Sequence, residues 1–300
     1  MNRIAGLVRL MRPVNVVICG LSVIAGGSLG GKPLTELAGL ATIIFSRGLW
    51  NLEPWQWRTI LAALSASLIL AAGNVLNDVC DVSCDRINAP DRPIPAGRVS
   101  RVTAAVFAAC LAAAGILTAI PLGPAGISVA AVATILLAWY DLRLKRVPLA
   151  GNVTVATLGG LAFLYGGIAG YAPLRSLLPA IFAFLYHLGR ELIKDAADYP
   201  GDTAADIRTV ATVRGIPAAG RTAAVVLGVL AVATLMPLAA GLFGWAYGAV
   251  TAVLVLPPVC WCIAGSIRAT SPVQFSRFSA VLKAGMPAGI LAVLVGFQMA

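Results

Sequence analysis

The stretch Asn74–Asp85 carries two amides and three carboxylates at helical spacing. These residues are Asn74, Asn77, Asp78, Asp81 and Asp85. At roughly 100° per residue in a helix, all five fall within an arc of about 100°. Three carboxylates on one face repel one another and are costly beside lipid unless a cation lies between them. Hard divalent ions such as Mg²⁺ bind oxygen ligands of this kind, and substrate phosphates commonly complete their shell. The stretch therefore predicts Mg²⁺ bound together with a phosphorylated substrate.

A second acidic group lies within the stretch Glu191–Asp202. Glu191, Asp195 and Asp198 share a helical arc of roughly 60°, and Asp202 would join them if the helix continued past Pro200. Two carboxylate faces that meet can bridge metal ions to a diphosphate. Either group alone also fits a structural role, whereas the pair favours a metal site. The metal ligands and catalytic residues that we expect are Asp78, Asp81, Asp85, Asp195, Asp198 and Asp202.

Further polar side chains flank the two acidic groups and are candidates for binding the substrate. Lysine and arginine can hold the phosphate oxygens that metal ions leave free, and a proline-stiffened loop presents such cations at little entropic cost. Anchoring of these cations at the membrane surface is the alternative. The substrate-binding residues that we expect are Asn74, Asn77, Arg92, Arg98, Tyr140, Lys145, Arg146, Asn152 and Arg208.

The single histidine, His187, lies in an apolar run, about 80° around the helix from the second acidic group. We expect it to be packed and neutral. A Ser-His-Asp or Cys-His mechanism is not supported by one histidine in this setting.

The segments that must position these residues are strongly apolar. The chain has 300 residues, of which 59% are hydrophobic and 11% charged, and its mean hydropathy is +0.90. These values indicate an all-α, polytopic membrane protein, which we treat as a single domain, 1–300. Residues 32–58 contain a short apolar run followed by three tryptophans, and we expect an interfacial or re-entrant piece there. Nine spans are predicted: Val14–Leu29, Thr59–Leu76, Val102–Ile120, Ala125–Trp139, Ala150–Ala169, Leu177–Leu192, Ala218–Ala240, Trp245–Ala264 and Ser279–Met299.

The charges follow these spans. Seventeen of the 22 Lys and Arg residues fall in the N-terminal segment and the even-numbered connections, which therefore face the cytoplasm by the positive-inside rule. Ten of the 12 acidic residues fall on the same side. The net charge of +10 is thus explained by topology, and no nucleic-acid-binding motif accompanies it. We expect a multi-pass protein of the cell membrane with its active site facing the cytoplasm.

These motifs resemble those of the UbiA family of intramembrane prenyltransferases. Asn77, Asp81 and Asp85 resemble the first aspartate motif of that family. Asp195, Asp198 and Asp202 resemble the second, and Tyr140 with Lys145 resembles a Tyr-x4-Lys element between them. The stretches 12–20, 77–100 and 189–202 look most like the ether-lipid branch, the digeranylgeranylglyceryl phosphate synthases. Two features depart from the family pattern: Asp141 stands where serine is common, and the segment 32–58 is long.

This resemblance implies nine helices around a central cavity and a Mg²⁺-dependent reaction. A geranylgeranyl or similar prenyl group would pass from its diphosphate to a lipid hydroxyl such as that of geranylgeranylglycerol phosphate. The expected partners are the prenyl diphosphate, the lipid acceptor and membrane lipids, with no nucleic acid. An aromatic quinone precursor or a tetrapyrrole is the alternative acceptor. A cation-coupled transporter is the alternative in another class, although its acids would lie nearer the bilayer midplane and its halves would form inverted repeats.

Overall fold

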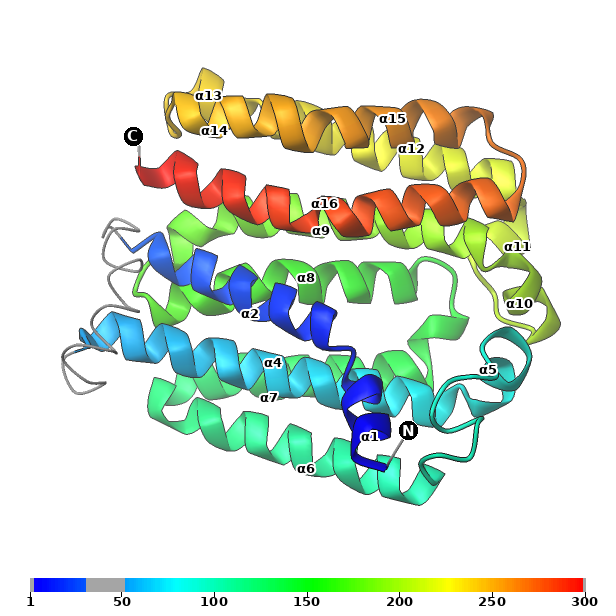
Figure 1. Ribbon diagram of the computed structural model, residues 1–300. Helices are drawn as coiled ribbons and strands as arrows, with labels where there is room; N and C mark the ends of the chain where they lie inside the picture. The colour runs from blue at the N-terminus through cyan, green and yellow to red at the C-terminus, as the bar shows by residue number, and fades with distance from the viewer. Residues whose placement is uncertain (1–2, 31–51, 299–300) are drawn as a thin grey trace.

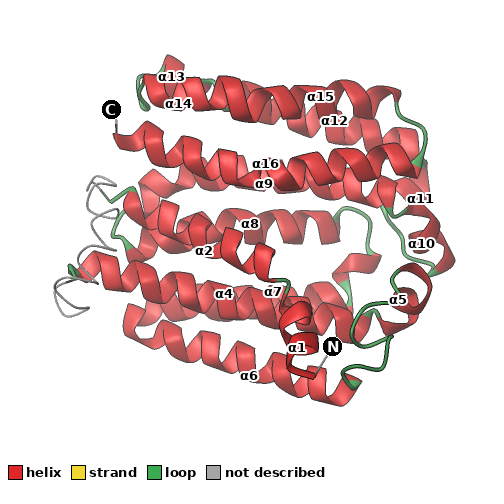
Figure 2. Ribbon diagram, viewed as in Figure 1, coloured by secondary structure: helices red, strands yellow, loops and turns green. Residues whose placement is uncertain are grey.

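The computed structural model describes residues 3–30 and 52–298. Helices make up the ordered elements of these ranges, and no strand occurs in them (Figure 2). In chain order they are α1 (Arg3–Met11), α2 (Pro13–Ser28), α4 (Pro54–Cys80), α5 (Val82–Asn88), α6 (Arg101–Ala119), η2 (Ile120–Leu122), α7 (Gly123–Leu142), η3 (Leu144–Arg146), α8 (Ala150–Ala169), α9 (Pro173–Ala197), α10 (Tyr199–Ala204), α11 (Val210–Arg214), α12 (Ile216–Ala233), α13 (Met236–Ala239), α14 (Trp245–Val250), η4 (Thr251–Val255), α15 (Leu256–Arg268) and α16 (Pro272–Gln298).

The predicted all-α membrane architecture is confirmed, but the count of nine spans is not. Within the described residues, seven helices are long and apolar enough to cross a membrane, or eight if α1 and α2, bent by 44°, form one span. Two of the predicted spans correspond to α6 and α7, which η2 joins directly, and the range Arg101–Leu142 enters these seven as one candidate. In that stretch α6 and α7 contact each other, and both pack on α4 (Figure 1).

The first half of the chain packs around α4, which contacts α2, α6, α7 and α8. The second half packs around α9, which contacts α12 and α16, and α12 in turn contacts α15. The strong contact between α8 and α9 joins the two halves. Close approach of α2 and α8 depends on glycine, because a Cβ atom at Gly26 or Gly166 would overlap the backbone of the facing helix.

The start of α4 corrects one prediction. The helix begins at Pro54, where a span was expected only from Thr59, so Trp55 and Trp57 belong to its first turns. Proline is favoured in the first turn because its missing N–H has no helical partner there. The side chain of Gln56 accepts the Glu53 N–H at 2.9 Å, which caps this end. The rest of the predicted interfacial piece lies almost wholly outside the described residues.

The segments predicted to share one side of the membrane gather at one end of the bundle. α5, α10, α11 and the α15–α16 connection all lie at the right of Figure 1. The chain therefore brings both acidic groups to the same end.

Candidate active site

The first acidic group spans a helix boundary. α4 ends at Cys80 and α5 begins at Val82, so Asp81 lies between two helices and the prediction of one uninterrupted helix is wrong there. The offset is small, because the Asp81 N–H still donates to the Asn77 carbonyl at 2.9 Å. The Asp85 N–H likewise donates to the Asp81 carbonyl at 2.8 Å. At this break Asp81 forms an ion pair with Lys145 of η3. Sequence spacing within α4 and α5 does not predict this tertiary contact.

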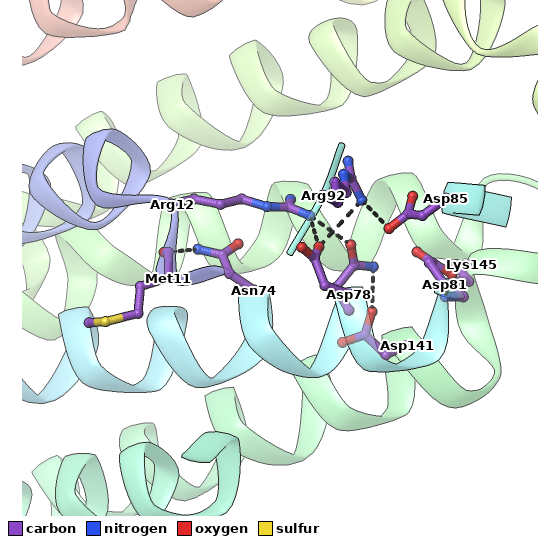
Figure 3. Close-up of polar contacts among 10 residues, drawn as sticks. Met11, Arg12, Asn74, Asp78, Asp81, Asp85, Arg92, Asp141 and Lys145 are labelled. Atoms are coloured by element: carbon purple, nitrogen blue, oxygen red, sulfur yellow. Dashed lines mark hydrogen bonds and ion pairs between the residues drawn. The ribbon is translucent and has the colours of Figure 1, made fainter. Parts of the chain in front are cut away.

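Two arginines bind the buried carboxylates of this group (Figure 3). Asp78 and Asp85 are only 4% and 6% exposed. Arg12 Nη2 lies 2.6 Å from Asp78 Oδ1, and Arg92 Nη1 lies 3.3 Å from the same oxygen and 2.7 Å from Asp85 Oδ2. Charge-assisted contacts of this kind offset the cost of burying carboxylates. Arg92 thus reaches the site as predicted.

Arg12 is held in a conformation that is uncommon for a residue with a side chain. It caps α2 with φ 55° and ψ 68°, in the left-handed region. Such a conformation costs about 1–2 kcal/mol and persists only where surrounding contacts impose it. Its guanidinium contacts Asp78 and also donates to Asn77 Oδ1 at 3.0 Å. The bend between α1 and α2 is therefore tied directly to the acidic group.

The end of α7 is joined to the same group. Asn77 Nδ2 donates to Asp141 Oδ1 at 2.8 Å, and Asp141 is 3% exposed. Lys145 of η3 forms an ion pair with Asp81. Asn77 and Lys145 thus lie at the site as predicted, and Asp141 joins them as a buried partner.

Asn74 makes a different contact. Its Nδ2 donates to the Met11 carbonyl at 2.9 Å, in the residue before Arg12. This bond helps to hold the break between α1 and α2 against α4. Through this bond Asn74 holds the backbone beside Arg12 in place, next to the acidic group.

The second acidic group also falls at a helix boundary. α9 ends at Ala197, and α10 begins at Tyr199, so the break comes at Asp198. Pro200 lies in the first turn of α10, where a missing N–H is tolerated, and does not itself end the helix. The Asp202 N–H donates to the Asp198 carbonyl at 3.0 Å, so Asp202 stays close to the helical path.

Side chains from α8 and α9 hold this second group. Asn152 Nδ2 donates to Asp195 Oδ2 at 2.9 Å, which places Asn152 at the site as predicted. Lys194 Nζ lies 3.3 Å from Asp198 Oδ2 in an exposed pair. Tyr140 of α7 is under the electrostatic influence of Asp141, which is bound to the first group, and of Lys194, Glu191 and Asp195 in the second.

The two acidic groups lie close to each other. α5 contacts α10. The pKa of Asp202 is raised to about 6 by burial and by the charge of Asp198, with Asp81 of the first group adding to the effect. The pKa of Asp85 is also raised, first by burial, although its bond to Arg92 acts in the opposite direction. Buried carboxylates with raised pKa values gain from a bound cation.

Three predicted residues lie at the rim. Arg98 is exposed and donates to the Asp91 carbonyl at 3.4 Å, and Arg146 and Arg208 are exposed. Within the described residues none of the three pairs with an aspartate of either group. Their side chains are long and solvated, so sequence position alone did not determine their contacts.

The donor atoms fit Mg²⁺, although they do not form a preassembled cage. In the described residues, no three His, Cys, Asp or Glu side chains are close enough to hold a metal ion together. Mg²⁺ usually binds one or two carboxylates and takes its other ligands from water and phosphates. The carboxylates at both helix boundaries supply hard oxygen donors of that kind. Arg92 and Lys145 supply the positive charge at Asp85 and Asp81 in this structure.

A small apolar cavity of about 80 Å³ lies within the bundle. Side chains of α2, α8, α9, α12, η4 and α16 line it, among them Ile18, Phe163, His187 and Ile290. His187 lies against Gly159 of α8 and is half-buried, which agrees with the expected packed histidine.

Sequence reasoning assigned no site role to Arg12. It counted this residue among the cations that set the topology. Its position immediately before Pro13 indicates a break between helices, because proline disfavours the α conformation of the preceding residue, but it does not indicate the contact with Asp78.

The chain resembles known proteins both in sequence and in fold. The UbiA prenyltransferase family matches residues 37–281. A digeranylgeranylglyceryl phosphate synthase of Methanopyrus kandleri is 35% identical over 286 residues, which cover 95% of this chain and 96% of that protein. Another, of Methanoculleus marisnigri, is 37% identical over 292 residues and 96% of both chains.

Two solved structures share the fold. One, described as a digeranylgeranylglyceryl phosphate synthase in membranes, has a TM-score of 0.74 and 22% identity, and the match covers 100% of both chains. The other is a UbiA homologue from Archaeoglobus fulgidus bound to GPP and Mg²⁺. Its TM-score is 0.57 and its identity 18%, over 96% of this chain and 99% of that one.

Proposed function

Because the chain belongs to the UbiA prenyltransferase family, we propose that it catalyses the reaction of the digeranylgeranylglyceryl phosphate synthases. In that reaction a geranylgeranyl group passes from its diphosphate to the free hydroxyl of geranylgeranylglyceryl phosphate. The relatives that bear this name match almost the whole chain. The observation that carries the proposal is the meeting of two acidic groups, one at the α4–α5 boundary and one at the α9–α10 boundary.

The acidic groups would bind the donor diphosphate through metal ions. Asp78, Asp81 and Asp85 on one side and Asp195, Asp198 and Asp202 on the other would hold Mg²⁺. When bound, Mg²⁺ takes up negative charge on the leaving diphosphate. The UbiA homologue that binds GPP and Mg²⁺ supports this assignment by its fold.

The chain's own residues position the groups that react. Asn152 orients the Asp195 carboxylate, and Asn77 links Asp141 to Arg12. Arg92 and Lys145 already lie at the carboxylates and supply positive charge to phosphate oxygens. The bond between the allylic carbon and the diphosphate oxygen breaks, and the lipid hydroxyl oxygen forms an ether bond to that carbon. The hydroxyl proton leaves with the departing diphosphate.

Apolar surroundings protect the allylic carbon from water. The cavity between α2, α9 and α16 provides a water-poor place for the first part of a prenyl chain. Longer chains must continue along helix surfaces toward lipid, and Val14, Val17 and Leu21 of α2 are exposed apolar residues suited to that contact. By the distribution of cations, this end of the bundle faces the cytoplasm.

A direct assay of acceptors tests the proposal. The purified protein in lipid nanodiscs is incubated with geranylgeranyl diphosphate, Mg²⁺ and one acceptor at a time: geranylgeranylglyceryl phosphate, an aromatic quinone precursor or a tetrapyrrole. The expected product is the doubly prenylated glyceryl phosphate, with formation stopped by EDTA and restored by Mg²⁺. Efficient prenylation of an aromatic ring or tetrapyrrole, with no reaction of the glycerol lipid, would overturn the proposal. So would failure to consume the donor with any acceptor.

A further inference from the structure

Three helices that pack against one another, α2, α9 and α16, each carry a cation near the acidic site. These cations are Arg12 at the start of α2, Arg190 of α9 and Lys283 of α16. Arg190 and Arg12 are the charged groups with an electrostatic effect on Lys283 in the described residues. Lys283 is exposed, and within the described residues it makes no hydrogen bond or ion pair. A lysine whose charged neighbours are both arginines is suited to binding an anion.

Tight packing of α9 against α16 holds two of these cations in place. Tyr186 of α9 donates its hydroxyl to the Leu282 carbonyl at 2.5 Å, in the residue before Lys283. The two helices approach closely at Gly285, where a Cβ atom would lie 2.8 Å from that hydroxyl. α2 also contacts α16. Tyr186 is one helical turn from Arg190, so the bond fixes the levels of Arg190 and Lys283 relative to each other.

The local charges do not balance. Arg190 Nη1 donates to Glu191 Oε1 at 2.7 Å, and Arg12 contacts Asp78, which it shares with Arg92. Lys283 adds a charge that no carboxylate contacts in the described part of the chain. In addition, Arg190 Nε is buried without a hydrogen-bond partner. Buried unsatisfied donors are costly, and an acceptor oxygen placed here would satisfy this one.

The cluster lies at one end of the apolar cavity. On α16, Met286 and Ile290 line the cavity and lie on the same helical face as Lys283, three and seven residues away. On α9, the cavity residues Tyr186 and His187 are one turn from Arg190. A group of cations at the end of an apolar cavity matches a ligand with an anionic head and a hydrocarbon chain.

We propose that Arg12, Arg190 and Lys283 form the subsite for the phosphate of the acceptor lipid, separate from the acidic groups that bind the donor diphosphate. This inference rests on the proposed function. A phosphate monoester held by cations alone needs no metal ion. The acceptor would thus be bound through cationic side chains, and the donor diphosphate through Mg²⁺ and carboxylates. Because Arg12 also contacts Asp78 and Asn77, it links the acceptor's head to the donor site.

Substitution of Lys283 tests this subsite, because its side chain is exposed and unpaired. Lys283→Gln is compared with Arg277→Gln, which removes an exposed cation from another face of the same helix. Initial rates are measured with geranylgeranyl diphosphate and two acceptors, geranylgeranylglyceryl phosphate and the same lipid without phosphate. For Lys283→Gln, the KM of the phosphorylated acceptor should rise roughly tenfold or more, as expected for loss of a contact with a charged group. The KM of the donor and the rate at saturating acceptor should stay unchanged.

Matched variants make the result specific. Lys283→Arg should restore the acceptor KM, and Arg277→Gln should behave as the wild type. With the acceptor that lacks phosphate, wild type and Lys283→Gln should react equally. A rise in the donor KM, or an equal loss with both acceptors, would overturn the subsite. An unchanged acceptor KM in Lys283→Gln would also overturn it while leaving the proposed function standing. A wild-type protein inert toward the phosphorylated lipid would instead overturn the proposed function.

Discussion

The Arg12 backbone and side chain make opposing contributions to stability, and two substitutions separate them. Arg12→Ala removes the contacts to Asp78 and Asn77 and keeps a side chain in the left-handed region. Arg12→Gly removes the same contacts but also relieves the backbone strain. Both variants leave Asp78 in contact with Arg92 at 3.3 Å.

The magnitudes follow from burial and pairing. Breaking a fully buried ion pair costs about 3–5 kcal/mol. The Arg12 side chain is 34% exposed and Asp78 retains one partner, so we expect Arg12→Ala to lose only about 2 kcal/mol of unfolding free energy. A left-handed conformation costs an L-residue about 1–2 kcal/mol, and glycine avoids this strain. Part of that gain is offset, because glycine loses more conformational entropy on folding. Arg12→Gly should therefore be about 1 kcal/mol more stable than Arg12→Ala.

Unfolding in mixed micelles with increasing denaturant measures these differences. Arg9→Ala is the control, since Arg9 is an exposed arginine of α1 whose described side-chain bond is to the Asp91 carbonyl at 3.3 Å. We expect it to unfold within about 0.5 kcal/mol of the wild type. If Arg12→Gly is no more stable than Arg12→Ala, the strain argument fails. If both variants match Arg9→Ala, the ion pair does not hold the bend between α1 and α2.

Three further predictions concern the proposed metal and phosphate chemistry. Asp81→Asn and Asp198→Asn should each lower the transfer rate at least roughly 100-fold while the protein still inserts and folds. Product formation measures the rate, and gel filtration checks the fold. Full activity in both variants would exclude metal bridging. Because the pKa of Asp202 is raised to about 6, Mg²⁺ affinity should be highest above that pH and fall as the carboxylate protonates below it, by roughly tenfold per unit. Calorimetric Mg²⁺ titration across this range checks the slope, and Asp202→Asn should flatten it. Lys145→Gln should strengthen binding of Mg²⁺ alone, since it removes the cation paired with Asp81. The same change should weaken binding of the diphosphate. Weaker binding of both ligands would contradict the role of Lys145 as a phosphate-binding cation.

Helical periodicity predicted which acidic side chains share one face of a helix. Spacing alone put Asp78 and Asp85 on one face, and both carboxylates reach the same arginine in the structure. The count of spans and charges also placed the two acidic groups at one end of the bundle. Periodicity depends only on residues near in sequence, so it does not contain the helix boundary at Asp81, where Lys145 of η3 forms an ion pair with the aspartate. It also does not contain the boundary at Asp198, because Pro200 lies inside the first turn of α10 and does not itself end α9.

Several contacts that sequence spacing did not predict join residues across long separations. Asn74 is predicted to bind the substrate, and in the structure its amide donates to the Met11 carbonyl. Arg12 was counted as a topological cation, yet it binds Asp78, 66 residues away. Whether a cation near the end of a span is solvated or paired depends on which helices are neighbours. That information lies in tertiary packing, such as the close approach of α2 to α8.

The ion pairs that hold the acidic groups suggest how the donor is bound. Arg92 and Lys145 contact Asp85 and Asp81, and they are also the cations assigned to the phosphate oxygens. A carboxylate that binds Mg²⁺ no longer needs its cation, and a phosphate that arrives with the metal offers that cation a new partner. Binding of metal and diphosphate would then exchange one set of ion pairs for another with little change in buried net charge. If Mg²⁺ bound without the diphosphate, Arg92 and Lys145 would lose their carboxylate partners, and if the diphosphate bound without Mg²⁺, the carboxylates would lose theirs. The two ligands should therefore bind more tightly together than separately.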